Sequence, residues 1–273
     1  MKLGLIGEVL GHSLSPAIHE RLLAAQGLSG TYDLIEIPRG EVPGRVRALL
    51  RELDGFNVTI PYKMEVIPLL AGLSDEAAAI GAVNTVAVKD GAGRGYNTDY
   101  IGFSRTVDRI GADPAGRDAV VLGTGGASRA VIQCLHDRGA RRIFAVSRHP
   151  EAVDEAFRAF AAARGAELVS YEAVEAGEGA YLLVNGTPCG MWPKTDASPL
   201  TAETARKFPK VIDLIYNPGE TMLLREARAG GADGANGLYM LVAQAAAAEE
   251  IWLGRPLPAA LTDRIAAEME ALL

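Results

Sequence analysis

The chain has 273 residues, enough for one large domain or two small ones. Apolar residues make up 49% and charged residues 22%, so a sizeable core can form. The formal net charge of −7 argues against nucleic acid as a partner, because phosphate backbones bind basic surfaces.

Short apolar runs alternate with helical patterns through the first hundred residues, which predicts an α/β domain. The expected strands are residues 3–6, 32–37, 56–60 and 85–88. The expected helices are residues 16–26 and 42–53. Pro61 should end the third strand, because its nitrogen cannot donate to a ladder.

A second series of strands and helices starts near Arg117. The expected strands are residues 119–122, 143–146, 168–170, 181–184 and 211–214, and the expected helices are 127–138, 151–164, 240–253 and 258–272. Strands joined by helix-length crossovers predict a parallel, doubly wound sheet. The boundary near residue 102 follows from motif order, because no linker interrupts the chain.

A glycine-rich turn, residues 123–128, reads Gly-Thr-Gly-Gly-Ala-Ser between an expected strand and an expected helix. Its first glycine permits the tight turn, its second lets the backbone approach a pyrophosphate, and a small third residue allows close helix–strand packing. The helix N-terminus adds unpaired N–H groups and a positive dipole end. The context favours dinucleotide binding over a purely structural turn.

The residues that follow the expected strand 143–146 determine whether the pocket prefers NAD or NADP. NAD enzymes usually carry a carboxylate there, to bind the ribose 2′-hydroxyl. This chain has Ser147, Arg148 and His149 instead. A guanidinium can pair with a 2′-phosphate, which favours NADP, although Arg148 could also be a solvated side chain.

Two hydroxyls, Ser13 and Ser15, precede the first helix. Ser15 could serve as an N-cap with Pro16 in the first turn, which would leave Ser13 unexplained. A carboxylate at this helix start could accept hydrogen bonds from both.

Further polar residues cluster near the expected strand ends. Asn57 and Thr59 share one face of a strand, and Lys63 follows just past its end, where α/β folds place their sites. Lys63 could also be a surface lysine, and Asp99 could simply be a helix N-cap. Hydroxyls and amides suit a polyhydroxylated substrate, while Lys63 and Asp99 suit proton transfer during alcohol oxidation.

Eight motifs, in this order, resemble the shikimate dehydrogenase family and span nearly the whole chain. They are HSLSP at 12–16, NVTIPYK at 57–63, GAVNT at 81–85, NTDYIG at 97–102, GTGGASRA at 123–130, NGTPCGM at 185–191, DLIYNPGET at 213–221 and NGLYMLVAQA at 236–245. The resemblance implies a substrate-binding α/β domain, residues 1–102 and 238–273, and a Rossmann-like NADP domain, residues 103–237. The active site would lie in a cleft between them.

The resemblance also implies roles for individual residues. Lys63 would be the catalytic acid/base, paired with Asp99, and the sequence leaves open which of the two carries the proton. The substrate would be held by Ser13, Ser15, Thr59, Asn84, Tyr216 and Gln244, with Asp99 also on a ring hydroxyl. The cofactor would be bound by Gly123, Thr124, Gly125, Gly126, Ala127, Ser128, Ser147, Arg148, His149, Leu214, Gly237 and Met240, with Asp75 near it.

The sequence departs from the family at residues 147–152. The usual pattern is Asn-Arg-Thr with a second basic residue a few positions on, whereas here Pro150-Glu151-Ala152 follows His149. Only Arg148 is always cationic, and His149 contributes charge only when protonated.

We therefore expect an NADP-dependent shikimate dehydrogenase, which interconverts 3-dehydroshikimate and shikimate in aromatic amino-acid biosynthesis. The alternatives are a quinate/shikimate dehydrogenase with relaxed substrate or cofactor choice, a dehydrogenase of another pathway, and a non-catalytic ligand-sensing module.

The sequence shows no sign of a metal site, a membrane segment or a nucleic-acid partner. Two cysteines 55 residues apart, Cys134 and Cys189, indicate neither a disulfide framework nor a zinc site, and no metal is expected. With no signal peptide and no long apolar segment, we expect a cytoplasmic monomer or homodimer that binds neither membranes nor nucleic acid.

Overall fold

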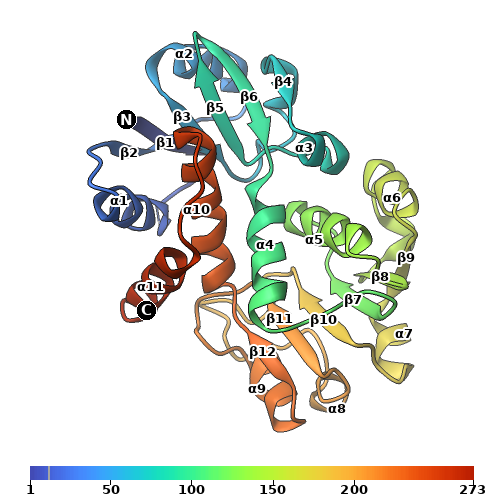
Figure 1. Ribbon diagram of the computed structural model, residues 1–273. Helices are drawn as coiled ribbons and strands as arrows, with labels where there is room; N and C mark the ends of the chain where they lie inside the picture. The colour runs from blue at the N-terminus through green and yellow to red at the C-terminus, as the bar shows by residue number, and fades with distance from the viewer. Residues whose placement is uncertain (12) are drawn as a thin grey trace. The chain divides into compact units, whose positions relative to one another are not determined.

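The computed structural model describes residues 1–11 and 13–273; His12 of the HSLSP motif lies outside them. The chain forms two compact units, Met1–Gly102 with Val242–Met269, and Phe103–Leu241 with Glu270–Leu273 (Figure 1). The first boundary falls where the sequence places it. The return into the first unit comes at residue 242 rather than 238, and the last four residues group with the second unit.

The first unit is built on a six-stranded sheet of order β2-β1-β3-β5-β6-β4. Its strands are β1 (Lys2–Gly7), β2 (Thr31–Glu36), β3 (Gly55–Val58), β4 (Gly72–Leu73), β5 (Thr85–Lys89) and β6 (Ala92–Tyr96). Its helical segments are α1 (Ser15–Ala25), α2 (Val42–Glu52), η1 (Ile67–Leu69), α3 (Asp75–Ile80) and α11 (Ala259–Glu270), and it shares α4 (Thr98–Arg109) and α10 (Leu238–Leu253) with the second unit.

This sheet is mixed rather than parallel throughout. β1 pairs in parallel with β2 and β3, whereas β5 runs antiparallel to both β3 and β6. A turn through Asp90 and Gly91, both with positive φ, joins β5 to β6 as the Asp-Gly pair predicts.

The sequence pattern missed β6 because two of its five residues are glycines. A Cβ on Gly93 would lie 2.6 Å from Leu50, and one on Gly95 would lie 2.7 Å from Val83. Neighbouring apolar side chains therefore fill the space, and the strand itself shows no apolar alternation.

The second unit carries a fully parallel six-stranded sheet of order β12-β11-β10-β7-β8-β9. Its strands are β7 (Asp118–Leu122), β8 (Arg142–Ser147), β9 (Ala166–Ser170), β10 (Leu182–Asn185), β11 (Lys210–Asp213) and β12 (Asp233–Ala235). Its other helical segments are α5 (Gly126–Asp137), η2 (Pro150–Ala152), α6 (Glu155–Ala162), α7 (Tyr171–Ala176), α8 (Ala202–Ala205) and α9 (Met222–Ala229).

The predicted helix 151–164 divides into η2 and α6. The Asp154 side chain accepts a hydrogen bond from the Phe157 amide at 2.8 Å, so a new helix is capped there. The strand order is that of a doubly wound dinucleotide-binding sheet, and it reverses between β7 and β10. The predicted fold class is confirmed.

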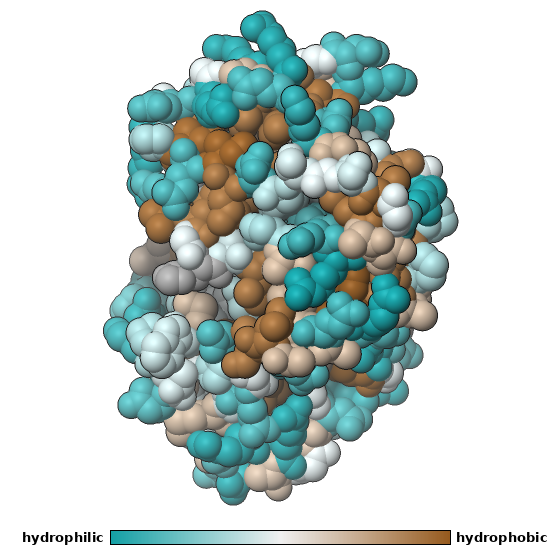
Figure 2. Space-filling view, turned by 90° about the vertical axis from the view of Figure 1, so that its left-hand side faces the viewer, coloured by the Kyte–Doolittle hydropathy of each residue, from teal (hydrophilic) through white to brown (hydrophobic). Residues whose placement is uncertain are grey.

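Each unit has its own apolar core. In the first unit Val46, Leu49 and Phe56 are fully buried, and in the second Leu122, Leu183 and Val211 are fully buried. The face drawn in Figure 2 is mostly hydrophilic, with apolar patches in its upper part and near its centre. Among the described residues no helix is both long and apolar enough to cross a membrane.

Candidate active site

The polar cluster of the first unit forms where strand ends meet. β3 ends at Val58, two residues before the predicted end, while the antiparallel β5 begins at Thr85, opposite Asn57. The start of β5 therefore lies at the carboxyl end of β3, where the Val58 amide donates to the Asn84 carbonyl at 2.9 Å although the two residues are far apart in sequence.

Lys63 and Asp99 form an ion pair. The Lys63 Nζ donates to Asp99 Oδ2 at 2.5 Å, and the two side chains remain 18% and 14% exposed. Asp99 lies in the first turn of α4, and Asn97 rather than Asp99 caps this helix by accepting from the Tyr100 amide at 3.2 Å. Asp99 is therefore not the N-cap of α4, and Lys63 is a partly buried lysine in an ion pair.

Asn84 fixes the orientation of Asp99. Its Nδ2 donates to Asp99 Oδ1 at 2.9 Å, and its Oδ1 accepts from the Thr98 amide at 2.6 Å. Each Asp99 oxygen therefore has a different donor, one from Asn84 and one from Lys63.

Ser13 and Ser15 lie at the start of α1. The helix begins at Ser15 with Pro16 in its first turn. Leu14 is the N-cap residue, and its side chain makes no capping hydrogen bond, so Ser15 is not the N-cap. Ser13 Oγ accepts from the Ser15 amide at 3.2 Å.

Ser15 also reaches a tyrosine that sequence reasoning missed. Burial raises the pKa of Tyr32, and a hydrogen bond with the Ser15 side chain opposes this shift. The Tyr32 hydroxyl donates to Asn57 Oδ1 at 2.7 Å, so Tyr32 links Ser15 to the strand ends.

From Asn57 the hydrogen bonds continue to the last helix of the site. Asn57 Nδ2 donates to Thr85 Oγ1 at 2.9 Å, and the hydroxyls of Thr85 and Thr98 lie 3.0 Å apart. Thr98 Oγ1 then donates to Gln244 Oε1 at 3.3 Å. Asn57, Thr85 and Thr98 belong to the motifs NVTIPYK, GAVNT and NTDYIG. Because all three are buried, they position the substrate-site side chains rather than bind the substrate themselves.

Thr59 completes this group. Its amide donates to the Ile6 carbonyl at 2.9 Å, and its half-buried hydroxyl bonds to none of the described residues. A free hydroxyl beside an oriented Lys63–Asp99 pair can bind a substrate hydroxyl.

In the second unit, the glycine-rich turn follows β7 and leads into α5. Gly123 has φ +97°, and a Cβ there would lie 2.9 Å from Thr187, so a side chain is excluded twice over. Gly125 is the N-cap of α5, and a Cβ there would meet nothing within 4 Å. Ser128 is fully buried against Gly186, so it packs the helix on the sheet.

A pocket of about 660 Å³ opens at the carboxyl ends of these strands. It is lined by Gly123, Thr124, Gly125, Val146, Ser147, Arg148, Tyr171, Glu172, Gly186, Thr187, Pro188, Cys189 and Pro199. Its position beside β7 and β10, where the strand order reverses, is where doubly wound sheets bind dinucleotides. The open space next to the Gly125 Cα and the backbone amides at the start of α5 can accommodate a pyrophosphate.

Arg148 is exposed and makes no ion pair with any described residue, so its guanidinium is available to an anion. The neighbouring His149 lies 3.5 Å from the Glu151 carboxylate instead. Eight lining residues were not assigned from the sequence: Val146, Tyr171, Glu172, Gly186, Thr187, Pro188, Cys189 and Pro199. Four of them lie in the NGTPCGM motif at 185–191, so this motif was the sequence signal that could have placed them in the nucleotide pocket.

Gly237 approaches the loop after β11 very closely. A Cβ on Gly237 would lie 2.1 Å from the Leu214 carbonyl oxygen, and the Gly237 amide donates to the Ile215 carbonyl at 2.9 Å. Leu214 and Gly237 are therefore neighbours, as a shared nicotinamide site requires. Met240 is buried in α10. Tyr216 lies in the loop after β11, and burial raises the pKa of its hydroxyl.

Asp75 is exposed at the start of α3 in the first unit and does not line the nucleotide pocket. Among the described residues no group of three His, Cys, Asp or Glu side chains could hold a metal ion. Cys134 and Cys189 are free thiols.

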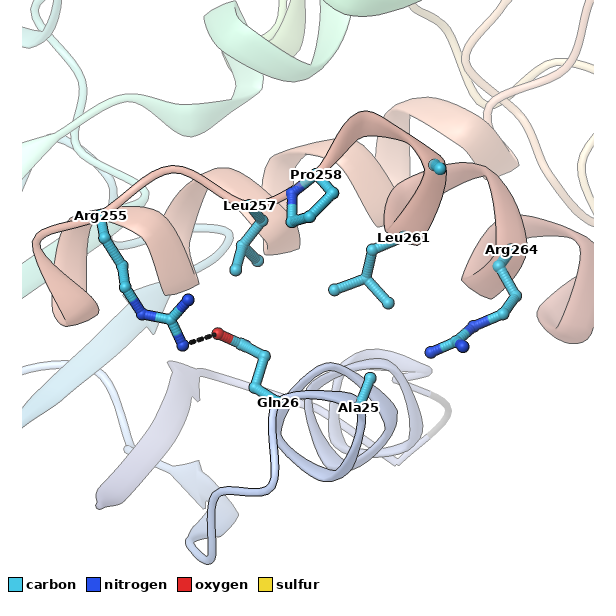
Figure 3. A pocket seen from close by; sticks show the side chains of 8 residues that line it. Ala25, Gln26, Arg255, Leu257, Pro258, Leu261 and Arg264 are labelled. Carbon is cyan, nitrogen blue, oxygen red and sulfur yellow. Dashed lines mark hydrogen bonds between the residues drawn. The ribbon is translucent and has the colours of Figure 1, made fainter.

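A further pocket of about 520 Å³ lies between α1 and the segment that ends α10 and begins α11 (Figure 3). Leu257, Pro258 and Leu261 form its apolar wall, and Arg255 donates to Gln26 Oε1 at 2.8 Å. None of the predicted site residues line it.

A doubly wound unit with a glycine-rich nucleotide pocket, joined to an α/β unit that carries an oriented lysine–aspartate pair, defines a two-domain dehydrogenase. Family models described as the shikimate dehydrogenase substrate binding domain and the shikimate 5′-dehydrogenase C-terminal domain match residues 5–86 and 237–264. The shikimate dehydrogenase (NADP(+)) of Clostridium perfringens strain SM101 is 41% identical over 99% of both chains. The chain belongs to the shikimate dehydrogenase family.

Solved structures agree. A chorismate mutase/shikimate 5-dehydrogenase fusion protein from Clostridium acetobutylicum matches with TM-score 0.93 and 41% identity, over 99% of this chain and 97% of the other. Shikimate 5-dehydrogenase from Thermus thermophilus, in complex with NADP(H) and shikimate, matches with TM-score 0.86 and 36% identity, over 98% and 99% of the two chains.

Proposed function

We propose that this chain catalyses the reversible, NADPH-dependent reduction of 3-dehydroshikimate to shikimate in the pathway to chorismate and the aromatic amino acids. The observation that carries the proposal is the Lys63–Asp99 pair, held at 2.5 Å and still accessible, among hydroxyls and amides at the strand ends. Family membership supplies the substrate class.

The substrate residues have complementary tasks. The hydroxyls of Ser13 and Ser15 would donate to the substrate carboxylate. Thr59, Asn84, Asp99 and Gln244 would bind ring hydroxyls, with Tyr216 also lining the substrate site. Because Asn84 already donates to Asp99, its main contribution is to aim that carboxylate.

Lys63 and Asp99 would move the proton at the reacting oxygen. During reduction the Lys63 ammonium donates a proton to the oxygen that becomes the hydroxyl, and during oxidation the pair takes it back. Asp99, fixed by Asn84, keeps Lys63 in place and shares the charge of the site.

NADP, when bound, supplies or accepts the hydride. Gly123 to Ala127 would bind its pyrophosphate, with Ser128 setting the helix–strand distance. Ser147, Arg148 and His149 would bind the 2′-phosphate end, and Leu214, Gly237 and Met240 would surround the nicotinamide. For Asp75 we keep only a place near the cofactor.

The first test follows NADPH absorbance with shikimate or quinate, each with NADP⁺ or NAD⁺. We expect shikimate with NADP⁺ to be the best combination. Lys63→Ala should lower kcat by about 100-fold or more, the usual range for removing a general acid–base group, with cofactor Kd unchanged. Near-normal turnover in this variant would reject the assigned role of Lys63.

A second candidate is a quinate/shikimate dehydrogenase with relaxed NAD/NADP choice. The observation that favours it is the presence of a single arginine and a carboxylate, Arg148 and Glu172, among the described residues that line the nucleotide pocket. Comparable rates with NAD⁺ or quinate would support it, and inactivity in all four combinations would favour a ligand sensor.

We propose a cytoplasmic location and a monomeric or homodimeric state. The free thiols Cys134 and Cys189 suit a reducing compartment. Cell fractionation and light scattering on the purified chain test the two proposals.

A further inference from the structure

Two adjacent strand ends bring opposite charges into the nucleotide pocket. β8 and β9 are parallel neighbours with Ser147 opposite Ser170, so their backbones lie about 4.8 Å apart there. Arg148 follows the first strand and Glu172 follows the second, and both line the same pocket. Within the described part of the chain, no other acidic residue lines it.

The electrostatic effects of these residues on one another agree with this proximity. Burial raises the pKa of Tyr171, and the positive charge of Arg148 opposes that shift. Hydrogen bonds from its own backbone amide and from Ser170 lower the pKa of Glu172, and the charge of protonated His149 lowers it further. Glu172 thus belongs to the group of side chains that would surround the 2′ position of the adenosine ribose.

We infer that Glu172 is a specificity-determining residue of this pocket, whose carboxylate weakens the preference for a 2′-phosphate that Arg148 creates. This inference rests on the proposed use of the pocket for a nicotinamide dinucleotide. A carboxylate repels the phosphate of NADP, whereas it accepts a hydrogen bond from the 2′-hydroxyl of NAD.

Glu172 also makes local hydrogen bonds, and the experiment must separate their effect from its electrostatic effect on the nucleotide. Its carboxylate interacts with its own backbone amide and with Ser170, whose side chain caps α7 by accepting from the Ala173 amide. Glutamine keeps an acceptor for these bonds and removes the charge. Glu172→Gln therefore isolates the electrostatic effect.

The experiment measures Kd for NADP⁺ and NAD⁺ by titration calorimetry, without shikimate, on the full chain. In Glu172→Gln we expect NADP⁺ to bind about 5- to 30-fold more tightly, as expected for loss of a like-charge repulsion across a partly solvated pocket. NAD⁺ should bind equally or more weakly. Arg148→Gln should have the opposite effect on NADP⁺.

The matched control is Glu167→Gln, which removes the same charge from an exposed position on β9 outside the pocket. It should change neither Kd. Equal changes for both nucleotides in Glu172→Gln, or none, would overturn the inference and leave Glu172 with only its local hydrogen bonds at the start of α7. Wild-type protein that binds neither nucleotide would overturn both the inference and the proposed function. Tight NADP⁺ binding without shikimate turnover would overturn the proposed function alone.

Discussion

Two glycines of the second unit differ in what an added methyl group would meet. A Cβ on Gly237 would collide with the Leu214 carbonyl, whereas one on Gly125 would project into the empty side of the nucleotide pocket. At the residue scale, the first glycine serves the fold and the second serves the ligand.

We predict that Gly237→Ala destabilises the protein by about 1–3 kcal/mol or more, because backbone must shift to relieve the contact. Gly125→Ala should leave the melting temperature unchanged and raise the NADP⁺ Kd about tenfold or more, since the methyl group would occupy pyrophosphate space. Thermal unfolding and calorimetric titration of both variants check this. Destabilised Gly125→Ala with normal binding would contradict the assignment.

A buried histidine–glutamate pair in the first unit offers a stability test. His19 Nδ1 lies 2.8 Å from Glu249 Oε1, both side chains are fully buried, and His19 Nε2 and Glu249 Oε2 have no hydrogen-bond partner among the described residues. His19 also stacks on Tyr32 at 4.1 Å between ring centroids.

Removing one member leaves the other buried and unpaired, so His19→Ala should cost about 1–3 kcal/mol or more. The double variant His19→Ala with Glu249→Ala should cost less than the sum of the single variants. Chemical denaturation of the four proteins completes the cycle, and additive losses would show that the two residues are not coupled.

At the scale of elements, one carboxylate connects two parallel strands. Asp118 at the start of β7 accepts hydrogen bonds from Arg141 and from Arg142, its partner in the β7–β8 register. The Arg141 and Arg142 side chains hold the pKa of Asp118 well below its ordinary value.

This shift predicts a pH-dependent contribution to stability. A lowered folded pKa adds stability above the unfolded value of about 3.9, and this stability is lost as pH falls through the folded value. Because both arginines are more than half exposed, we expect Asp118→Asn to cost only about 1 kcal/mol at neutral pH. Urea titrations from neutral pH to below about pH 4 should show the difference shrinking; a constant difference would reject the ion-pair explanation.

At the scale of the whole molecule, the two units should respond to different ligands. NADP⁺ at about 100 times its Kd stabilises the state that binds it by about 2.7 kcal/mol. We expect NADP⁺ to protect the amides of residues 123–128 from hydrogen exchange, and shikimate to protect those near Ser15 and Lys63. Protection of the first unit alone by NADP⁺ would contradict the division of tasks.

The sequence by itself determined the α/β class, most of the strands and the parallel second sheet, and it predicted two sets of site residues. Regular apolar periodicity and turn residues are local signals, and strands such as residues 143–146 and helices such as 42–53 carry them clearly. The structure changes the ends of these two segments by one residue. Where the signal is absent, as in β6 with Gly93 and Gly95, the element was missed.

Only the tertiary structure decided which distant residues meet. It gave the Lys63–Asp99 pair, which the resemblance only implies, its 2.5 Å contact, assigned the capping of α4 to Asn97, and inserted Tyr32 between Ser15 and Asn57. It also placed Glu172 and Arg148 on the lining of one pocket, because strand pairing sets neighbours that no local pattern records. The chemistry of each side chain can be read from the sequence. Contacts between distant side chains depend on strand order and register, which are set only when the whole core packs.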